Sequence, residues 1–173
     1  AAASSGDITS VVAGTGLSGG GTSGDVTLNS DLLAKQGGTN FTNSLLVGTS
    51  STGTLNSADG NTGVGTGVLG ALTTGDNNVA VGLNALDLNT TGSENTAVGK
   101  VALCKNTTGI QNTAIGTNIM RQNTTGDQNV ALGYRALDAN TTADNNTAVG
   151  ADALKANTTG SENTALGICA SGS

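Results

Sequence analysis

The amino-acid sequence repeats itself every 17 residues over most of its length. The pattern Asn-(Thr/Val)-small-(Val/Ile/Leu)-Gly begins at seven asparagines, with no insertion or deletion between them: Asn61, Asn78, Asn95, Asn112, Asn129, Asn146 and Asn163. The full unit is N-T-A-V-G-x-x-A-L-x-x-N-T-T-G-x-x, and unit positions 1 to 17 are counted from its first asparagine. Such constant spacing is typical of a coil whose successive turns stack residue on residue.

The unit is too short for the helix pairs of helical repeats, and Asn-Thr and Thr-Thr-Gly are poor helix formers. β-Branched residues beside glycine favour short strands that end in turns. We therefore expect an all-β, parallel β-roll or β-solenoid of seven 17-residue rungs. Each rung has a strand at positions 1–4, a second strand at about 7–10, and an Asn-Thr-Thr-Gly turn. A glycine turn at position 5 joins the two strands; its residues are Gly65, Gly82, Gly99, Gly116, Gly133, Gly150 and Gly167.

Two columns of large aliphatic residues are the predicted core. Side chains alternate between the two faces of a strand, so a position that is always aliphatic is expected to point inward. Position 4 supplies Val64, Val81, Val98, Ile115, Leu132, Val149 and Leu166. Position 9 supplies Leu69, Leu86, Leu103, Met120, Leu137 and Leu154.

Position 3 would then face outward, yet it is always small. After Gly63 in the first unit it is alanine throughout: Ala80, Ala97, Ala114, Ala131, Ala148 and Ala165. An outer column held small and apolar predicts that another protomer packs against it. The alternative is that alanine only keeps the strands flat.

The Asn-Thr-Ala-Val-Gly core resembles the S-V-A-I-G motif in the head repeats of trimeric autotransporter adhesins of the YadA-like, Hep/Hag type. The longer unit with its Asn-Thr-Thr-Gly turn resembles repeats of phage and viral tail fibres. The resemblance covers residues 61–167 and implies a left-handed parallel β-roll with three chains side by side. The unit here is longer than the YadA-like unit, and its extra residues fall in the Asn-Thr-Thr-Gly turn.

Residues 1–60 lie outside the period and are expected to form an irregular, β-rich attachment or lead-in region, or else a linker. Residues 8–17 and 25–28 predict two short strands around a glycine-rich turn at 18–22. This stretch also resembles segments of phage tail fibres. Residues 44–48 and 53–55 are interpreted as irregular lead-in coils, and residues 168–173 as a C-terminal tail. The first residues, Ala1–Ser5, suggest a processed or trimmed end.

The composition excludes several functional classes. The chain has no histidine, tryptophan or proline, only 1% aromatic residues and a formal net charge of −6. A nucleic-acid binder needs a basic face with aromatic side chains, and no apolar run approaches the ~20 residues of a membrane span. We therefore expect no nucleic-acid partner and no membrane insertion. Acidic residues fall at turn positions 16 and 17, where solvated charges are expected, so no catalytic residues are predicted; they include Asp76, Asp127, Asp144, Glu94 and Glu162.

The turns also carry residues that are typical of ion-binding, ice-binding and glycosylation sites. Asp76, Asp127 and Asp144 could offer oxygen ligands to Ca²⁺, although the glycine-rich calcium repeat is absent, and no cofactor is expected. Adjacent threonines at positions 13 and 14 raise ice binding as a minor alternative. Cys104 and Cys169 lie four rungs apart, too far for a disulfide within the chain. Asn-X-Thr glycosylation sequons begin at Asn40, Asn89, Asn106, Asn123, Asn140, Asn145 and Asn157.

The sequence thus predicts a non-enzymatic structural segment, the stalk or head of a trimeric fibre or adhesin on a virion or cell surface. Its partners would be two further copies of itself and a cell-surface glycan or receptor. The alternative is a secreted filament subunit that polymerises end to end through its open rungs.

Overall fold

The computed structural model describes residues 11–12, 17–21, 28–30, 44–48 and 56–171, and every regular element in these ranges is a strand. Three strands, β1 (Val11–Val12), β2 (Leu17–Gly21) and β3 (Leu28–Ser30), form an antiparallel sheet in that order. Here the expectation differs, because Ser18 and the glycines at 19–21 belong to the central strand and not to a turn.

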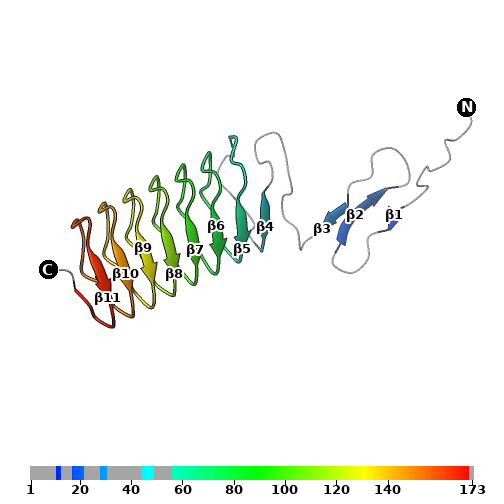
Figure 1. Ribbon diagram of the computed structural model, residues 1–173. Coiled ribbons are helices and arrows are strands. Elements are labelled where there is room, and N and C mark those ends of the chain that lie inside the picture. Colours follow the sequence, from blue (N-terminus) through cyan, green and yellow to red (C-terminus); the bar gives the residue numbers. More distant parts are fainter. Residues whose placement is uncertain (1–10, 13–16, 22–27, 31–43, 49–55, 172–173) are drawn as a thin grey trace, which may run out of the picture.

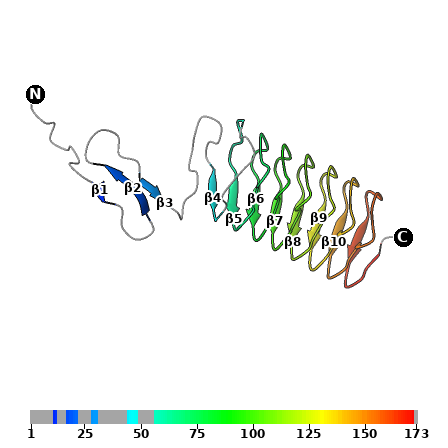
Figure 2. The same ribbon diagram turned by 180° about the vertical axis from the view of Figure 1, so that it is seen from behind.

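Eight further strands form one parallel sheet in chain order (Figure 1). They are β4 (Leu45–Val47), β5 (Thr62–Val64), β6 (Val79–Val81), β7 (Thr96–Val98), β8 (Thr113–Ile115), β9 (Val130–Leu132), β10 (Thr147–Val149) and β11 (Thr164–Leu166). Each pairs with the strand 17 residues away, so that Ala97 lies beside Ala114 and Ala114 beside Ala131. Both views show one coil of stacked turns (Figures 1 and 2). The predicted all-β parallel solenoid is confirmed.

The solenoid extends beyond the sequence motif at both ends. β4 pairs with β5 in the same 17-residue register, although residues 44–48 lack the asparagine and were expected to form an irregular coil. After Gly167, the backbone nitrogen of Leu154 donates to the carbonyl oxygen of Ala170, so residues 168–170 continue the last rung. Segments 49–55 and 172–173, with the predicted coil at 53–55, lie outside the described residues.

The second strand of each rung is not formed, and positions 6–12 wind through turns instead. Positions 7 and 9 take the left-handed backbone conformation, as in Val101 (φ 52°) and Leu103 (φ 49°). A β-branched or bulky residue rarely adopts this conformation. Here the stack holds it, because each such turn bonds to the equivalent turns of neighbouring rungs; the Leu103 nitrogen, for example, donates to the Ile119 oxygen at 3.1 Å.

The predicted orientation of the first strand was wrong. The alanine column at position 3 lies inside the coil: Ala80, Ala97, Ala114, Ala131 and Ala148 are fully buried and Ala165 is 5% exposed. Position 4, predicted as core, points outward, with Val64, Ile115, Leu132 and Leu166 exposed and Val81, Val98 and Val149 half-buried. The alanines therefore do not form an outer interface, and the position-4 side chains are not core.

The narrow interior explains this orientation. The position-9 column, from Leu69 to Leu154, is buried and fills the coil from the opposite wall. A methyl group placed on Gly63 would lie 3.4 Å from Leu69 Cδ1 and 3.1 Å from Val68 Cγ2. Within the repeat only a small side chain fits at position 3, because the position-9 leucine occupies the space in front of it. The first rung has the buried Leu46 at this position, and its side chain takes the space that a methyl group on Gly63 would need.

Candidate association surface

The outer face of the parallel sheet carries two columns of uncharged side chains, which we call the association face. It consists of unit positions 2 and 4 on strands β4–β11. Position 2 supplies Leu45, Thr62, Val79, Thr96, Thr113, Val130, Thr147 and Thr164. Position 4 supplies Val47, Val64, Val81, Val98, Ile115, Leu132, Val149 and Leu166.

Large exposed hydrophobic side chains gather at this face. Of those in the described residues, all but Leu88 and Ile110 lie at position 2, position 4 or the neighbouring position 6, which contributes Leu83, Tyr134 and Ile168. Leu132 is 45% exposed, and Val130 beside it is 41% exposed. Scattered exposed aliphatic residues are ordinary, but their alignment on one sheet makes this face the candidate for an interaction site.

A ladder of buried asparagines at position 1 supports the sheet from within. Asn112 donates its backbone N–H and side-chain Nδ2 to the Oδ1 of Asn95 at 3.0 and 3.2 Å. Its own Oδ1 accepts the same two bonds from Asn129. The ladder runs from Asn61 to Asn163, and at its start the Ser44 hydroxyl accepts the N–H of Asn61. The strands are therefore held in one register by side chains as well as by the backbone.

A second ladder of asparagines follows position 12 on the opposite side of the turn. Asn106 donates Nδ2 to Asn89 Oδ1 at 2.8 Å and to the Gly109 carbonyl oxygen at 2.9 Å. The repeated bonds extend from Asn89 to Asn157. No buried side-chain nitrogen or oxygen among the described residues lacks a hydrogen-bond partner. The polar interior is thus fully satisfied, which is the condition for a buried polar network to stabilise a fold.

The threonines and aspartates of the turns also form hydrogen bonds between neighbouring rungs. At position 13 the hydroxyl of Thr107 donates to the Thr124 carbonyl oxygen at 3.0 Å, so this column is engaged between rungs. The carboxylates of Asp76, Asp127 and Asp144 each accept a backbone N–H from the preceding rung. The part of the chain that the structure describes holds no group of three or more His, Cys, Asp or Glu side chains arranged for a metal ion.

Two arginine–aspartate pairs lie away from the sheet, at positions 10 and 7. Arg121 and Asp138 form a bidentate pair at 2.6 and 2.8 Å, and Arg135 and Asp152 form another at 2.8 and 3.1 Å. The hydrogen bond from Arg135 lowers the pKa of Asp152 and raises that of Arg135 itself. Arg135 also lies 4.9 Å from the centre of the Tyr134 ring. These pairs tie neighbouring rungs together at the surface.

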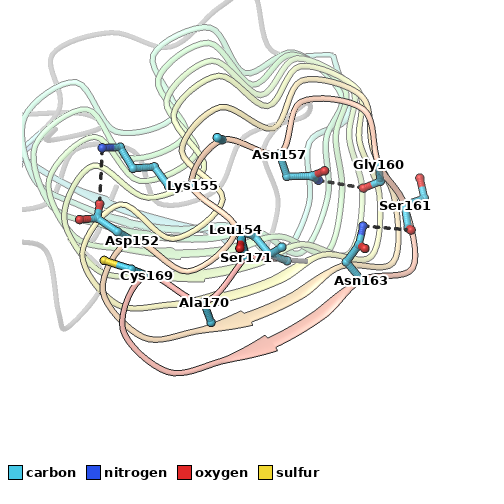
Figure 3. A pocket seen from close by; sticks show the side chains of 11 residues that line it. Asp152, Leu154, Lys155, Asn157, Gly160, Ser161, Asn163, Cys169, Ala170 and Ser171 are labelled. Atoms are coloured by element: carbon cyan, nitrogen blue, oxygen red, sulfur yellow. Dashed lines mark hydrogen bonds and ion pairs between the residues drawn. The ribbon is translucent and has the colours of Figure 1, made fainter. Parts of the chain in front are cut away.

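The two cysteines are both free. Cys104 is half-buried, and burial raises the pKa of its thiol, which favours the protonated form. Cys169 is exposed and lines a hollow of about 740 Å³ at the C-terminal end of the coil (Figure 3). Leu154, Ala170 and the amides of Asn157 and Asn163 line the same hollow, so it is the uncovered interior of the last rung.

On the first strand the predicted inner and outer positions are exchanged, whereas the position-9 column is buried as predicted. The signal that could have placed them is position 1, which is asparagine in every unit and shares its face with position 3. Position 2 alternates between threonine and valine, as an outward site can. The buried role of the position-12 asparagines was also missed, because turn asparagines are ordinarily solvated.

The described residues contain no helix with the length and apolar character needed to cross a membrane. No protein-family model, curated protein or solved structure matches the chain, so its architecture is established by its own geometry.

Proposed function

We propose that this chain is a non-enzymatic structural rod that associates side by side with two further copies of itself. The trimer would form a stiff fibre or adhesin segment at a virion or cell surface. The observation that carries the proposal is the association face, a continuous uncharged column of exposed aliphatic and threonine side chains along the whole parallel sheet.

The size of this face supports self-association. Eight strands at a spacing of about 4.8 Å make it about 34 Å long, and three residues per strand make it about 10 Å wide. Each chain therefore offers on the order of 340 Å² of flat, uncharged face, which is in the range of the patches of a few hundred Å² that mark interaction sites.

Its chemistry favours a second copy over other partners. Positions 2 and 4 carry no charge on any rung, whereas Asp87, Arg121, Asp138 and Lys155 occupy position 10. Identical faces can therefore meet without burying an unpaired charge, which would be costly. Because the coils have the same rise, rungs of parallel chains can stay level along the whole contact.

The rod itself explains the mechanical role. Backbone bonds, two asparagine ladders and surface ion pairs all connect one rung to the next. Bending the coil would stretch many of these bonds at once. The variable outer positions 7, 10 and 11 are then free to contact a glycan or receptor weakly and repeatedly, so that avidity provides the binding strength.

Sedimentation and native mass spectrometry test the proposal. The unmodified chain is expected to form a discrete species of three chains. Leu132→Glu, which places a charge on the association face, is expected to yield folded monomers, whereas Gln122→Glu, at an outer variable position, leaves the trimer intact. A monomeric unmodified chain, or normal assembly of Leu132→Glu, would overturn the proposal. A distribution of lengths would favour the end-to-end filament instead.

A further inference from the structure

We propose that Asn145 is a glycosylation sequon that the described part of the rod can carry when folded, and that the buried Asn-Thr-Thr sequons must stay unmodified for the rod to form. This inference does not depend on the proposed function. It rests on where the structure places two kinds of sequon that look alike in the sequence.

The repeated sequons begin at position 12, inside the coil. Asn89, Asn106, Asn123 and Asn140 are all 0% exposed. Asn123 uses both hydrogens of its side-chain amide, one to Asn106 Oδ1 at 2.9 Å and one to the Gly126 carbonyl oxygen at 3.0 Å. A sugar bound to Nδ2 would replace one of these hydrogens and remove one ladder bond.

There is also no room for a sugar in this corner. A single methyl group added at Gly109 would already lie 3.1 Å from Asn123 Nδ2, and one at Gly92 would lie 2.8 Å from Asn106 Nδ2. A hexose is many times larger than a methyl group, so it would separate the stacked turns. A chain modified here before folding would be unable to close its coil at that rung.

Asn145 differs from the ladder asparagines in its position, its exposure and its hydrogen bonding. It stands at position 17, where the turn enters β10, and its side chain is exposed. Its backbone N–H donates to the Asp127 carbonyl oxygen at 3.1 Å, but its side-chain amide makes no hydrogen bond within the described residues. Thr147, half-exposed, supplies the sequon hydroxyl.

The reaction needs a glycosyl donor and a transferase that recognises Asn-X-Thr. With UDP-glucose as donor, the bond between glucose C1 and the phosphate oxygen breaks and UDP leaves. A bond forms between C1 and the asparagine Nδ2, which gives up one proton. The position of the modified asparagine in the fold determines whether the glycosylated chain can form a native rod.

The test is to produce the chain in a bacterial cytoplasm together with a soluble N-glycosyltransferase that uses UDP-glucose. The sequons at Asn40 and Asn157 are first removed by Thr42→Ala and Thr159→Ala. Protease-resistant, soluble chains are then separated from aggregates, and each fraction is mapped by peptide mass spectrometry. We expect glucose on Asn145 in the folded fraction, and glucose on Asn89, Asn106, Asn123 or Asn140 only in the aggregates.

Two matched variants complete the design. Asn145→Gln should remove the sugar from the folded fraction without lowering its yield. Replacing the exposed Thr91, Thr108, Thr125 and Thr142 by alanine removes the ladder sequons while keeping every ladder asparagine, and should raise the folded yield several-fold. Glucose on Asn106 or Asn123 in folded chains would overturn the inference. So would the absence of glucose from Asn145 in both fractions.

Discussion

Asn78 and Asn89 donate their side-chain amides to the same acceptor, the carbonyl oxygen of Gly92, at 2.9 and 2.8 Å. The two residues belong to different ladders, one behind the parallel sheet and one behind the turn. This shared acceptor recurs at Gly109 and Gly126 and joins the ladders at one corner of every such rung. The corner closes the coil, because it links the start of the strand to the end of the winding segment.

The position-1 ladder is expected to be essential for stability. Asn112→Asp keeps the shape of the side chain but loses the donor that faces Asn95 Oδ1 and the Gly126 oxygen. It also places a carboxylate among buried acceptors. Since each unsatisfied buried polar group costs about 1–3 kcal/mol, we expect a loss of at least about 3 kcal/mol in unfolding free energy. Denaturant titration checks this.

Gln122→Ala, at a surface position where Lys105 is the hydrogen-bond partner, is the control and should change stability by no more than about 0.5 kcal/mol. Equal midpoints for Asn112→Asp and Gln122→Ala would show that the ladder does not hold the coil.

The position-9 column supplies the main aliphatic packing. Leu103→Ala or Leu137→Ala removes a fully buried side chain from a thin core, so we expect a loss of about 2–5 kcal/mol per chain. Lys155, at a variable outer position, should tolerate alanine within about 0.5 kcal/mol. Thermal melts followed by circular dichroism distinguish the two classes, and equal shifts for Leu137→Ala and Lys155→Ala would contradict the observed core.

The sequence predicts the stacking register of this fold but not the orientation of its strands. The 17-residue spacing of Asn61 to Asn163 predicts the parallel stack and its register, because a slip of one residue would misalign every column. The orientation of Ala97 and Val98 does not follow from the spacing, and only the invariant asparagine at position 1, on the face of position 3, points to it. Both faces of this strand are apolar, so alternation alone does not say which face is inside, and the choice depends on the width of the coil.

The turn conformation of positions 6–12 could not be predicted from the sequence either. Leu86 and Leu103 have a side chain that disfavours positive φ, so a strand was the natural expectation. Their conformation is imposed by bonds to neighbouring rungs, which no single unit contains. The association face consists of positions 2 and 4, so it could be located only once the structure showed that these positions point outward.

Glycine at position 5 is required by conformation and by space. Gly133 has φ 127°, and a methyl group there would lie 2.7 Å from the Gly150 carbonyl oxygen. Gly133→Ala is therefore expected to destabilise the coil by more than about 1 kcal/mol. Position 15 is a matched comparison, because Gly126 stands where the next unit has Ala143. Gly126 does not have a positive φ, although a methyl group there would lie 2.5 Å from the Ala143 carbonyl oxygen. Gly126→Ala should be milder in the same melting assay because it carries no conformational cost, and the reverse order would show that the backbone contact outweighs the conformation.

The surface ion pair between Arg135 and Asp152 predicts a small pH-dependent effect. The pKa of Asp152 is lowered in the folded chain, so its contribution is present above the ordinary aspartate pKa of about 3.9 and is lost as the pH falls through the lowered value. Asp152→Asn should therefore lower Tm slightly at pH 7. The difference from the unmodified chain should disappear in strong acid, at about pH 2.

Asp87→Asn is expected to act in the opposite sense. Burial raises the pKa of Asp87, so its charged form is disfavoured in the folded chain at neutral pH. Removing that charge should leave Tm unchanged or raise it at pH 7. A fall in Tm for Asp87→Asn as large as that for Asp152→Asn would contradict these assignments.

Neighbouring residues on β9 give the sharpest test of the inner and outer faces. Ala131 is fully buried, whereas Leu132 is 45% exposed. Ala131→Glu would force a carboxylate into the narrow interior against the leucine column, so the chain should fail to fold around that rung. Leu132→Glu places the same charge on the association face, and the separated chain should keep its β-rich circular dichroism spectrum. Hydrogen exchange should stay slow at the ladder amides of Leu132→Glu and become fast in Ala131→Glu. If Ala131→Glu instead folds and merely dissociates, the alanine column lies outside after all.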